Sequence, residues 1–453
     1  MPERLLLSGW GGTAATSATL QAVDPTTVAD AVRSSGPRGV IARGLGRSYG
    51  DAAQNAGGLV VEFGHTSDHI VLDRDASTVT VSAGVSLDLL MRALIPHGFF
   101  VPVSPGTRFV TVGGAIAADI HGKNHHVDGS FGSHVVSLDL VDGSGELRRL
   151  DPVGSPHPFW ATVGGMGLTG VIVAATVTMR RIETSRMTVD TERAGNLDQL
   201  LALMADTDDR YTYSVAWIDL LTTGSAMGRS VLTRGEHASL DQLPPRLRRE
   251  PLAFDPGQRV AAPAVIPTSL VGPVSIRAFN ELWYRKAPLS RRGQVATLAG
   301  FFHPLDGVGS WNRLYGPRGF VQYQFVVPFG TEDVLREAVR RITKAGHASF
   351  LAVLKRFGAA NAGPLSFPMP GWTLALDLPA AQSLAPLLDG LDRLVISAGG
   401  RIYLAKDSRA APETIEAMYP RLDEFKAVRL DMDPDRRFTS DLARRLHLTT
   451  GPR

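Results

Sequence analysis

The sequence predicts an α+β protein of two domains, the second built on a large antiparallel sheet. Three observations lead to this fold class. The chain has 453 residues, and about 100–200 residues per domain leaves room for two or three folding units. Residues 1–184 are rich in short strand patterns and Gly-rich turns. Residues 185–400 alternate longer strands with amphipathic helices, which is typical of a layered α+β fold.

Short apolar or alternating runs predict the elements of the first part. Strands are expected at residues 59–63, 69–72, 78–81, 135–141 and 171–179. The stripe Leu87, Leu90, Met91 and Leu94 predicts a helix that Pro96 and Gly98 close.

The second part has longer elements. Strands are expected at residues 211–219, 320–327, 350–354 and 372–378, and helices at 197–204, 333–345 and 383–396. Residues 401–453 again contain strand and helix patterns, and the chain has no internal repeat.

Composition excludes several classes of function. The net charge of +3 is too balanced for a nucleic-acid binder. The absence of cysteine excludes disulfides, thiolate metal sites and a cysteinyl-linked cofactor. The N-terminal apolar triplet at residues 5–7 is too short for a signal peptide, and no run approaches a transmembrane span.

A basic segment, residues 243–293, interrupts the second part. It contains nine basic and three acidic residues, with Trp283 and Tyr284 between apolar and Pro positions. One interpretation is a long solvated loop. The other is a mobile, basic and apolar flap that faces a lipid phosphate or a membrane surface.

Three Gly-rich clusters lie in the first part, at residues 43–50, 105–124 and 164–170. Glycines let backbone N–H groups converge on a phosphate. The first cluster follows a strand pattern, as in a Rossmann fold, but residues 51–58 lack the apolar period of the helix that should follow.

These clusters resemble the FAD-binding domain of vanillyl-alcohol-oxidase-like flavoproteins, of the PCMH type. The matching motifs are RGxGxSYG, PGTxxxTVGGAIAxDIHGKNHH and GGMGLTG. Further segments, at residues 211–217, 322–325, 367–372 and 403–409, resemble the decaprenylphosphoryl-β-D-ribose 2-oxidase family. The resemblance covers nearly the whole chain.

The resemblance implies an FAD-binding domain (residues 1–184), an inserted substrate-binding domain (185–400) and a C-terminal segment (401–453) that returns to the first. The implied reaction is FAD-dependent oxidation of the ribose 2-hydroxyl of decaprenylphosphoryl-β-D-ribose to a 2-keto intermediate. This is the first half of an epimerisation that supplies the arabinose donor for cell-wall arabinan. An NAD(P)H-dependent reductase would complete it. The resemblance also implies that the protein works at the cell envelope, on the periplasmic or cytoplasmic face of the inner membrane. Peripheral membrane contact is possible, and no nucleic acid is expected as a partner.

Residue by residue, the motifs assign three groups of site residues. The cofactor would be held by Arg43, Gly44, Leu45, Gly46, Arg47, Ser48, Tyr49, Gly50, Thr107, Gly113, Gly114, Ala117, Asp119, His121, Gly122, Asn124, Gly167, Val171 and Tyr403. The substrate would meet Lys123, Gln322, Gln324, Lys355, Ala375 and Lys406. The catalytic residues would be Lys406, His121 and Tyr49.

Lys406 is the favoured base, because burial in an apolar-flanked strand would lower its pKa toward the working range. His121 is the alternative base. Lys406 could instead hold a negative charge of flavin or substrate, or pair with Asp407 or Asp377. Trp217 and Trp372 are expected in the core.

Two positions depart from related patterns. Many sugar-lactone oxidases of the superfamily carry a flavin-linked His where this chain has Arg47, so FAD is expected to bind non-covalently. Ala375 stands where some ribose oxidases carry a Cys beside the flavin.

Other functions remain alternatives. The chain could be an aldonolactone or sugar-alcohol oxidase that uses O₂, a flavin-binding scaffold without turnover, or a peripheral membrane module. A metal site at His121, His125 and His126 lacks carboxylate partners at suitable spacing, and no metal is expected. A serine hydrolase would need a G-x-S-x-G motif, which the chain lacks.

Overall fold

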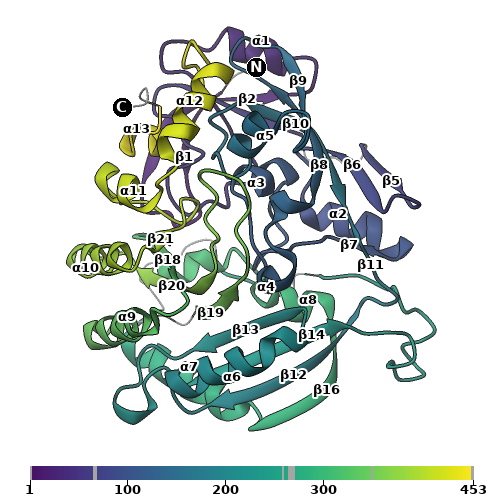
Figure 1. The fold of residues 1–453 in the computed structure, drawn as a ribbon, viewed down its shortest axis with the longest axis vertical. Coiled ribbons are helices and arrows are strands. Elements are labelled where there is room, and N and C mark those ends of the chain that lie inside the picture. Colours follow the sequence, from purple (N-terminus) through teal and green to yellow (C-terminus); the bar gives the residue numbers. More distant parts are fainter. Residues whose placement is uncertain are drawn as a thin grey trace.

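A computed structural model describes residues 3–64, 69–257, 260–263, 271–347, 349 and 351–449. Two sheets and the helices around them form one end of the molecule, and a third, larger sheet forms the other end (Figure 1). This mixture of helices with a large antiparallel sheet confirms the α+β prediction.

The N-terminal sheet is mixed, with strand order β1-β2-β4-β3. Its strands are β1 (Glu3–Ser8), β2 (Ala15–Val23), β3 (Val40–Ala42) and β4 (Leu59–Phe63), and α1 (Val28–Arg33) connects β2 to β3. β4 pairs in parallel with both β2 and β3. Ile41 and Val60 are fully buried, and their packing holds β3 in place. The first glycine cluster begins directly after this strand. Residues 51–58 form turns rather than the helix of a Rossmann fold.

A five-stranded antiparallel sheet lies beside it, in the order β5-β6-β10-β8-β9. Its strands are β5 (Ile70–Asp73), β6 (Thr78–Ser82), β8 (Val135–Val141), β9 (Leu147–Leu150) and β10 (Val171–Thr178). The nearby helices are α2 (Leu87–Leu94), α3 (Val112–Ala117), α4 (His125–Asp128) and α5 (Pro156–Thr162), and β7 (Phe99–Phe100) pairs with β11 (Arg180–Arg181). The predicted stripe of α2 is buried, and Ser86 caps the helix by accepting a hydrogen bond from the Leu89 N–H.

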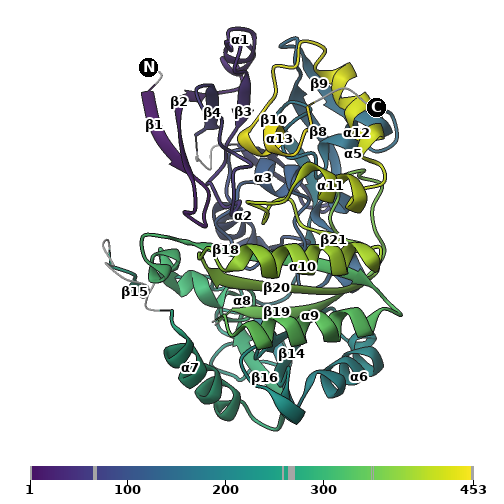
Figure 2. The same cartoon turned by 90° about the vertical axis from the view of Figure 1, so that its left-hand side faces the viewer.

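The large sheet has eight antiparallel strands in the order β16-β12-β14-β13-β19-β20-β18-β21. They are β12 (Arg186–Ala194), β13 (Tyr213–Ile218), β14 (Ser230–His237), β16 (Ser290–Thr297), β18 (Phe320–Pro328), β19 (Ala352–Phe357), β20 (Gly371–Pro379) and β21 (Arg401–Ile402). Helices α6 (Leu197–Thr207), α9 (Glu332–Ala345) and α10 (Leu384–Ser397) cover one face (Figure 2). The other face is turned toward the glycine-rich loops.

The C-terminal segment packs against the N-terminal part. After β21 the chain forms α11 (Pro412–Met418), α12 (Leu422–Met432) and α13 (Asp441–Arg445). Arg445 pairs with Asp51 at 2.7 Å and with Asp407 at 2.8 Å, and Phe438 bridges to Val40. These contacts tie the last fifty residues to the first sheet, although Ile402 still belongs to the large one.

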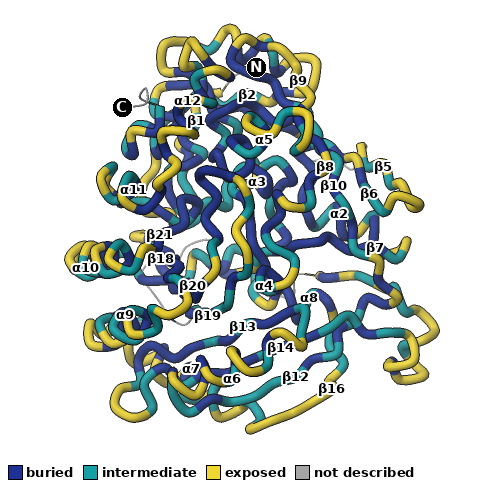
Figure 3. The backbone as a smooth tube through the Cα atoms, in the orientation of Figure 1, coloured by how far each residue is buried: buried dark blue, intermediate teal, exposed yellow. Residues whose placement is uncertain are grey.

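The basic segment is not simply a loop. It contains β15 (Val260–Ala261), the 14-residue helix α7 (Pro273–Lys286) and the start of β16; residues 258, 259 and 264–270 lie outside the described part. The sequence pattern missed α7 because its buried residues are one apolar and one polar side chain, Ile276 and Asn280. β16 is largely exposed along the edge of the sheet (Figure 3).

The remaining short elements are α8 (Leu298–Phe302) and β17 (Val308–Gly309), which pairs with β15. Among the described residues, none of the helices combines the length and the apolar character that crossing a membrane requires.

Candidate active site

A cavity of about 1030 Å³ lies between the three glycine clusters and the open face of the large sheet. Its volume exceeds the range of roughly 300–1,000 Å³ that is common for small-molecule sites. Loops of the first part line one side, and strands β12, β13, β14, β18, β19 and β20 line the other. The cavity is therefore large enough for a sizeable cofactor.

The first glycine cluster turns sharply into this cavity after β3. Gly46 has a φ of +62°, a backbone conformation that glycine adopts without strain. A Cβ atom at Gly44 would overlap with the side chain of Thr111. Arg47 lies over the Trp10 ring, with its guanidinium carbon 3.8 Å from the ring centroid, and its Nε donates to the Phe109 carbonyl at 3.2 Å.

The second cluster brings α3 against the floor of the cavity. The Thr111 hydroxyl accepts a hydrogen bond from the Gly114 N–H at 3.1 Å and caps the helix. A Cβ atom at Gly113 would lie 3.0 Å from the Ala83 side chain, whereas one at Gly106 would point into open space. From the third cluster, Gly167 lines the same wall. At their glycines the clusters bring bare backbone to the cavity wall, with cluster side chains such as Arg47 and Tyr49 between them.

The charge of the lining is one-sided. Its charged side chains are Arg43, Arg47, Lys123, Lys355 and Lys406, and no described Asp or Glu lines it. An anionic occupant would be favoured there, because each buried cation lacks a carboxylate at the cavity surface.

Burial lowers the pKa of all three lysines of the cavity. Burial lowers the pKa of Lys123 to about 7 and that of Lys355 to about 8. Burial also lowers the pKa of Lys406 to about 7, while the charge of Asp377 acts in the opposite direction. Near neutral pH each amine can therefore exist without its proton, as a general base requires.

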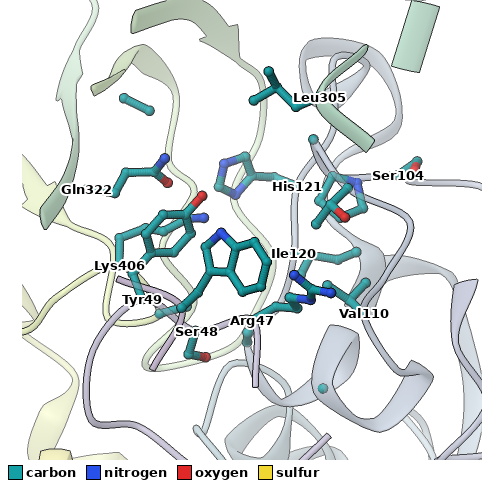
Figure 4. Close-up of a pocket in the computed structure, with 18 of the residues that line it drawn as sticks. Arg47, Ser48, Tyr49, Ser104, Val110, Ile120, His121, Leu305, Gln322 and Lys406 are labelled. Atoms are coloured by element: carbon teal, nitrogen blue, oxygen red, sulfur yellow. The ribbon is translucent and has the colours of Figure 1, made fainter. Parts of the chain in front are cut away.

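Lys406 lies in a turn after β21 and not in a strand, which corrects the sequence prediction. Its N–H donates to the Tyr403 carbonyl at 2.9 Å, and its Nζ lies 3.8 Å from the centre of the Tyr49 ring. Asp407 pairs with Arg445 instead of Lys406. Figure 4 shows Lys406, Tyr49, Gln322 and His121 around one region of the cavity.

Asp377 lies behind this group on β20. The Gln322 side chain donates to one carboxylate oxygen, and the Tyr315 hydroxyl donates to the other at 3.5 Å. Burial raises the pKa of Asp377 to about 7. The negative charge of Asp377 favours the protonated form of Lys406, so protonation of Asp377 removes this effect.

His121 is held by residues of the large sheet. Its Nε2 lies 2.9 Å from the Gln324 Nε2, and its ring packs among Phe357, Phe367 and Tyr403. Burial lowers its pKa well below the usual value, so the ring is neutral. Its buried Nδ1 has no hydrogen-bond partner within the part of the chain that the structure describes.

The structure brings most of the predicted site residues together. All the predicted catalytic and substrate residues line the cavity, as do the predicted cofactor residues other than Gly50, Asp119, Asn124 and Val171.

These four described residues do not line it, and their contacts explain why. The Asp119 carboxylate accepts hydrogen bonds from Ser130, Gly132, Asn361 and Ser366. It therefore stabilises a loop.

Packing accounts for the other three. The Asn124 side chain donates to the Pro102 carbonyl at 2.8 Å. Val171 is buried between sheet residues, and a Cβ at Gly50 would overlap with the Asp407 backbone.

Trp217 was wrongly expected in the core, because it lines the cavity. Trp372 is in the core as predicted, with its Nε1 donating to Glu332 at 2.9 Å. Val215 and Trp217 on β13 point to the cavity with Val231 on β14 and Val189 on β12. The alternation along β13 could have shown that Val215 and Trp217 lie on the same face of the sheet, since residues two apart share one face of a strand.

The cavity residues fit FAD, the cofactor that the glycine motifs imply. The clusters supply close-approach surfaces, the arginines offset the charge of a pyrophosphate, and His121 Nδ1 is a buried polar atom in need of a partner. Residue 47 is an arginine rather than a histidine, and non-covalent binding of FAD stays a prediction.

Comparison with known proteins agrees with this geometry. Residues 16–151 match the FAD binding domain family, and residues 382–446 match the D-arabinono-1,4-lactone oxidase family. The chain is 49% identical over 448 residues to the decaprenylphosphoryl-β-D-ribose oxidase of Mycolicibacterium smegmatis, covering 98% of this chain and 97% of that protein.

Two further relatives differ in coverage. An uncharacterized Streptomyces coelicolor protein of the mprA 5′ region is 45% identical, covering 80% of this chain and all of that protein. The D-arabinono-1,4-lactone oxidase of Kluyveromyces lactis is 32% identical, but covers 26% of this chain and 21% of its own length.

Proposed function

Because this chain belongs to the decaprenylphosphoryl-β-D-ribose oxidase family, we propose that it oxidises the ribose 2-hydroxyl of a polyprenyl-phosphoryl ribose to a ketone. The chain is an FAD-dependent oxidoreductase. The proposal concerns its substrate and the residues that act on it.

The observation that carries the proposal is the gradient of polarity across the large sheet. The polar lining residues Gln322, Gln324 and Lys355 come from β18 and β19, with Lys406 just after β21. At the other end of the strand order, β12, β14 and β13 contribute four apolar side chains and one hydroxyl group: Val189, Val231, Val215, Trp217 and Thr233. A sugar phosphate matches the polar end, and an isoprenoid chain matches the apolar end.

Lys406 is the proposed base. Its neutral Nζ would accept the proton of the 2-hydroxyl, and the pKa of about 7 lets it do so near neutral pH. Bound FAD supplies the acceptor for the hydride that leaves the same carbon. Gln322, held by Asp377, would orient the sugar through its remaining amide groups.

His121 serves better as a donor than as a base. An amide nitrogen only donates, so the His121 Nε2 accepts the hydrogen bond from Gln324. The ring proton is then on Nδ1, which can donate to a bound group. This assigns the base to Lys406 and leaves His121 a positioning role.

The phosphate of the substrate would be held by the remaining cations. Lys123 donates to the Phe301 carbonyl, and Lys355 contacts the Gly122 carbonyl at 3.5 Å. An ammonium group at either place would be stabilised by a phosphate oxygen in a buried, water-poor setting.

We also propose the setting in which the protein works. A ketone at this position needs a reductant to complete an epimerisation, so an NAD(P)H-dependent reductase is the expected partner. The epimerised product would serve cell-wall arabinan synthesis. A lipid-linked substrate implies work at the cell envelope, at the surface of the inner membrane.

A second candidate is oxidation of a sugar lactone, because residues 382–446 match the D-arabinono-1,4-lactone oxidase family. The test mixes the FAD-loaded protein without oxygen with polyprenyl-phosphoryl ribose or with an aldonolactone. Loss of flavin absorbance with the ribose lipid alone supports the proposal. Loss with the lactone alone overturns it, and loss with neither favours a scaffold without turnover.

A further inference from the structure

Helix α7 departs from an ordinary surface helix, because it buries polar side chains and exposes large apolar ones. Asn280 is buried and donates to Asp219 at 2.7 Å, and Tyr284 donates to the Ala194 carbonyl at 3.3 Å. By contrast, Val274 is 82% exposed and Leu282 is 68% exposed. The helix attaches to the protein through Ile276 and these polar side chains, and it also presents large apolar side chains to the outside.

Ion pairs and ring contacts also hold α7 against the rest of the protein. Glu281 pairs with Arg229 at 2.7 Å, and Arg229 in turn pairs with Asp219 at 2.9 Å. The Tyr284 ring lies between two guanidinium groups, 5.1 Å from Arg193 and 4.7 Å from Arg229. The exposed apolar side chains therefore do not result from a loosely placed helix.

Basic residues flank the exposed side. Arg285 and Lys286 end α7, Leu289 follows with 74% of its surface exposed, and Arg291 and Arg292 lie near the start of β16. Arg285 pairs with Glu281, and Arg292 pairs with Asp190 and Glu192, so Lys286 and Arg291 add positive charge beyond these ion pairs. Exposed apolar groups mixed with cations are typical of segments that lie in the headgroup region of an anionic bilayer.

The same helix borders the cavity. Phe279 and Trp283 stack with their ring centres 6.0 Å apart and line the cavity on its apolar side. Tryptophan is favoured at the boundary between water and acyl chains. α7 lies at the end of the molecule far from α1 and β1 in both views (Figures 1 and 2), so a flat surface can reach it.

We propose that the outer side of α7 and the turn after it (Val274, Leu282, Arg285, Lys286 and Leu289) bind the anionic surface of a lipid bilayer, with the cavity mouth toward the membrane. The biological role of this binding rests on the proposed function, since a polyprenyl-linked sugar would enter the cavity directly from the bilayer. The binding itself needs no substrate.

The first experiment uses the full-length, FAD-loaded protein and vesicles of phosphatidylcholine with or without phosphatidylglycerol. Co-sedimentation is expected with the anionic vesicles and should weaken at high salt. Val274→Ser with Leu282→Ser should reduce binding about tenfold or more. Arg285→Gln with Lys286→Gln should reduce it about fivefold for each charge removed. The matched control, Leu147→Ser with Val153→Ser, alters exposed apolar residues of the other part, 66% and 88% exposed.

The second experiment exploits the absence of cysteine in the chain. Leu282→Cys can be labelled at a single position with a dye whose emission shifts to the blue in an apolar setting. The shift is expected with anionic vesicles at position 282, and not in the control Leu147→Cys.

Three results would overturn the inference: no binding of wild-type protein to anionic vesicles, equal binding by the α7 variants, or equal dye shifts at positions 282 and 147. A change from dimer to monomer in Val274→Ser with Leu282→Ser, seen by light scattering, would assign the surface to a second copy instead. A separate assay measures oxidation of substrate dispersed in detergent, without vesicles, and distinguishes the proposed function from the proposed membrane-binding surface. Vesicle binding without oxidation rejects the function alone, and oxidation without vesicle binding rejects the docking surface alone.

Discussion

The Gln324 side chain of β18 donates a hydrogen bond to His121, with 2.9 Å between the two Nε2 atoms. It joins the large sheet to the second glycine cluster, which precedes it by some two hundred residues. The same amide nitrogen lies 3.2 Å from the Thr373 hydroxyl. One buried side chain therefore sets the tautomer of His121 and connects the two halves of the cavity.

Replacing Gln324 tests this connection. Gln324→Leu should lower the free energy of unfolding by about 1–3 kcal/mol, because it leaves a buried acceptor on His121 without a partner. Thr373→Val removes the other acceptor of the same amide and should cost less. Urea unfolding of the FAD-loaded protein measures both. Equal losses in the two variants would argue against a special role for the contact with His121.

Removing the amine of Lys406 tests the proposed base. Lys406→Met should reduce the rate of substrate oxidation by about 10²–10⁴-fold while FAD stays bound. In the wild-type protein the rate should rise with pH through about 7, because the base must lose its proton, and the variant should lack this rise. Lys344→Met, on the exposed side of α9, is the control. A retained inflection near pH 7 would assign it to another group.

Stability should depend on pH in an unusual direction above neutrality. The folded pKa values of Lys123, Lys355 and Lys406 lie at about 7, 8 and 7, below the ordinary 10.5. Between about pH 8 and 10 the unfolded chain therefore binds more protons, and the free energy of unfolding rises with pH.

Each such lysine contributes about 1.4 kcal/mol per pH unit in that window. Urea midpoints at several pH values measure the slope in protein without added substrate. Lys355→Met should reduce the slope of the free energy of unfolding against pH by the contribution of one lysine, whereas Lys344→Met should leave the slope unchanged. A slope that does not differ between these two variants would mean that Lys355 is charged in the folded state.

The flavin should leave the protein on denaturation. Residue 47 is an arginine, which is not a flavin attachment residue, and the chain has no cysteine. Acid precipitation should therefore release all of the yellow absorbance to the supernatant. Absorbance that stays with the pellet would reveal a covalent link through some other residue.

The strands and long helices were predictable because each repeats one physical pattern. β4 and β8 begin and end at the expected residues, and the stripe of α2 is buried as expected. The glycine clusters line one cavity because their motifs specify backbone geometry rather than distant contacts.

The remaining features depend on tertiary packing that no local pattern records. α7 attaches through Asn280 and Tyr284, so its apolar period does not mark its buried side. Trp217 alternates along β13 as a core residue would, but the sheet face it occupies borders the cavity. Asp119 lies inside a cofactor motif, yet its four hydrogen bonds direct it to a loop.

Oxidation at the ribose C2 carbon is the central claim, and isotopic substitution at that carbon tests it most directly. Polyprenyl-phosphoryl ribose with deuterium at C2 is mixed with the FAD-loaded protein without oxygen, and the loss of flavin absorbance is timed. The rate should be lower than with unlabelled substrate, whereas deuterium at C3 should change nothing, because only the C2–H bond breaks. A slower reaction with the C3-labelled substrate alone, or no loss of absorbance with any of the three, would contradict the account.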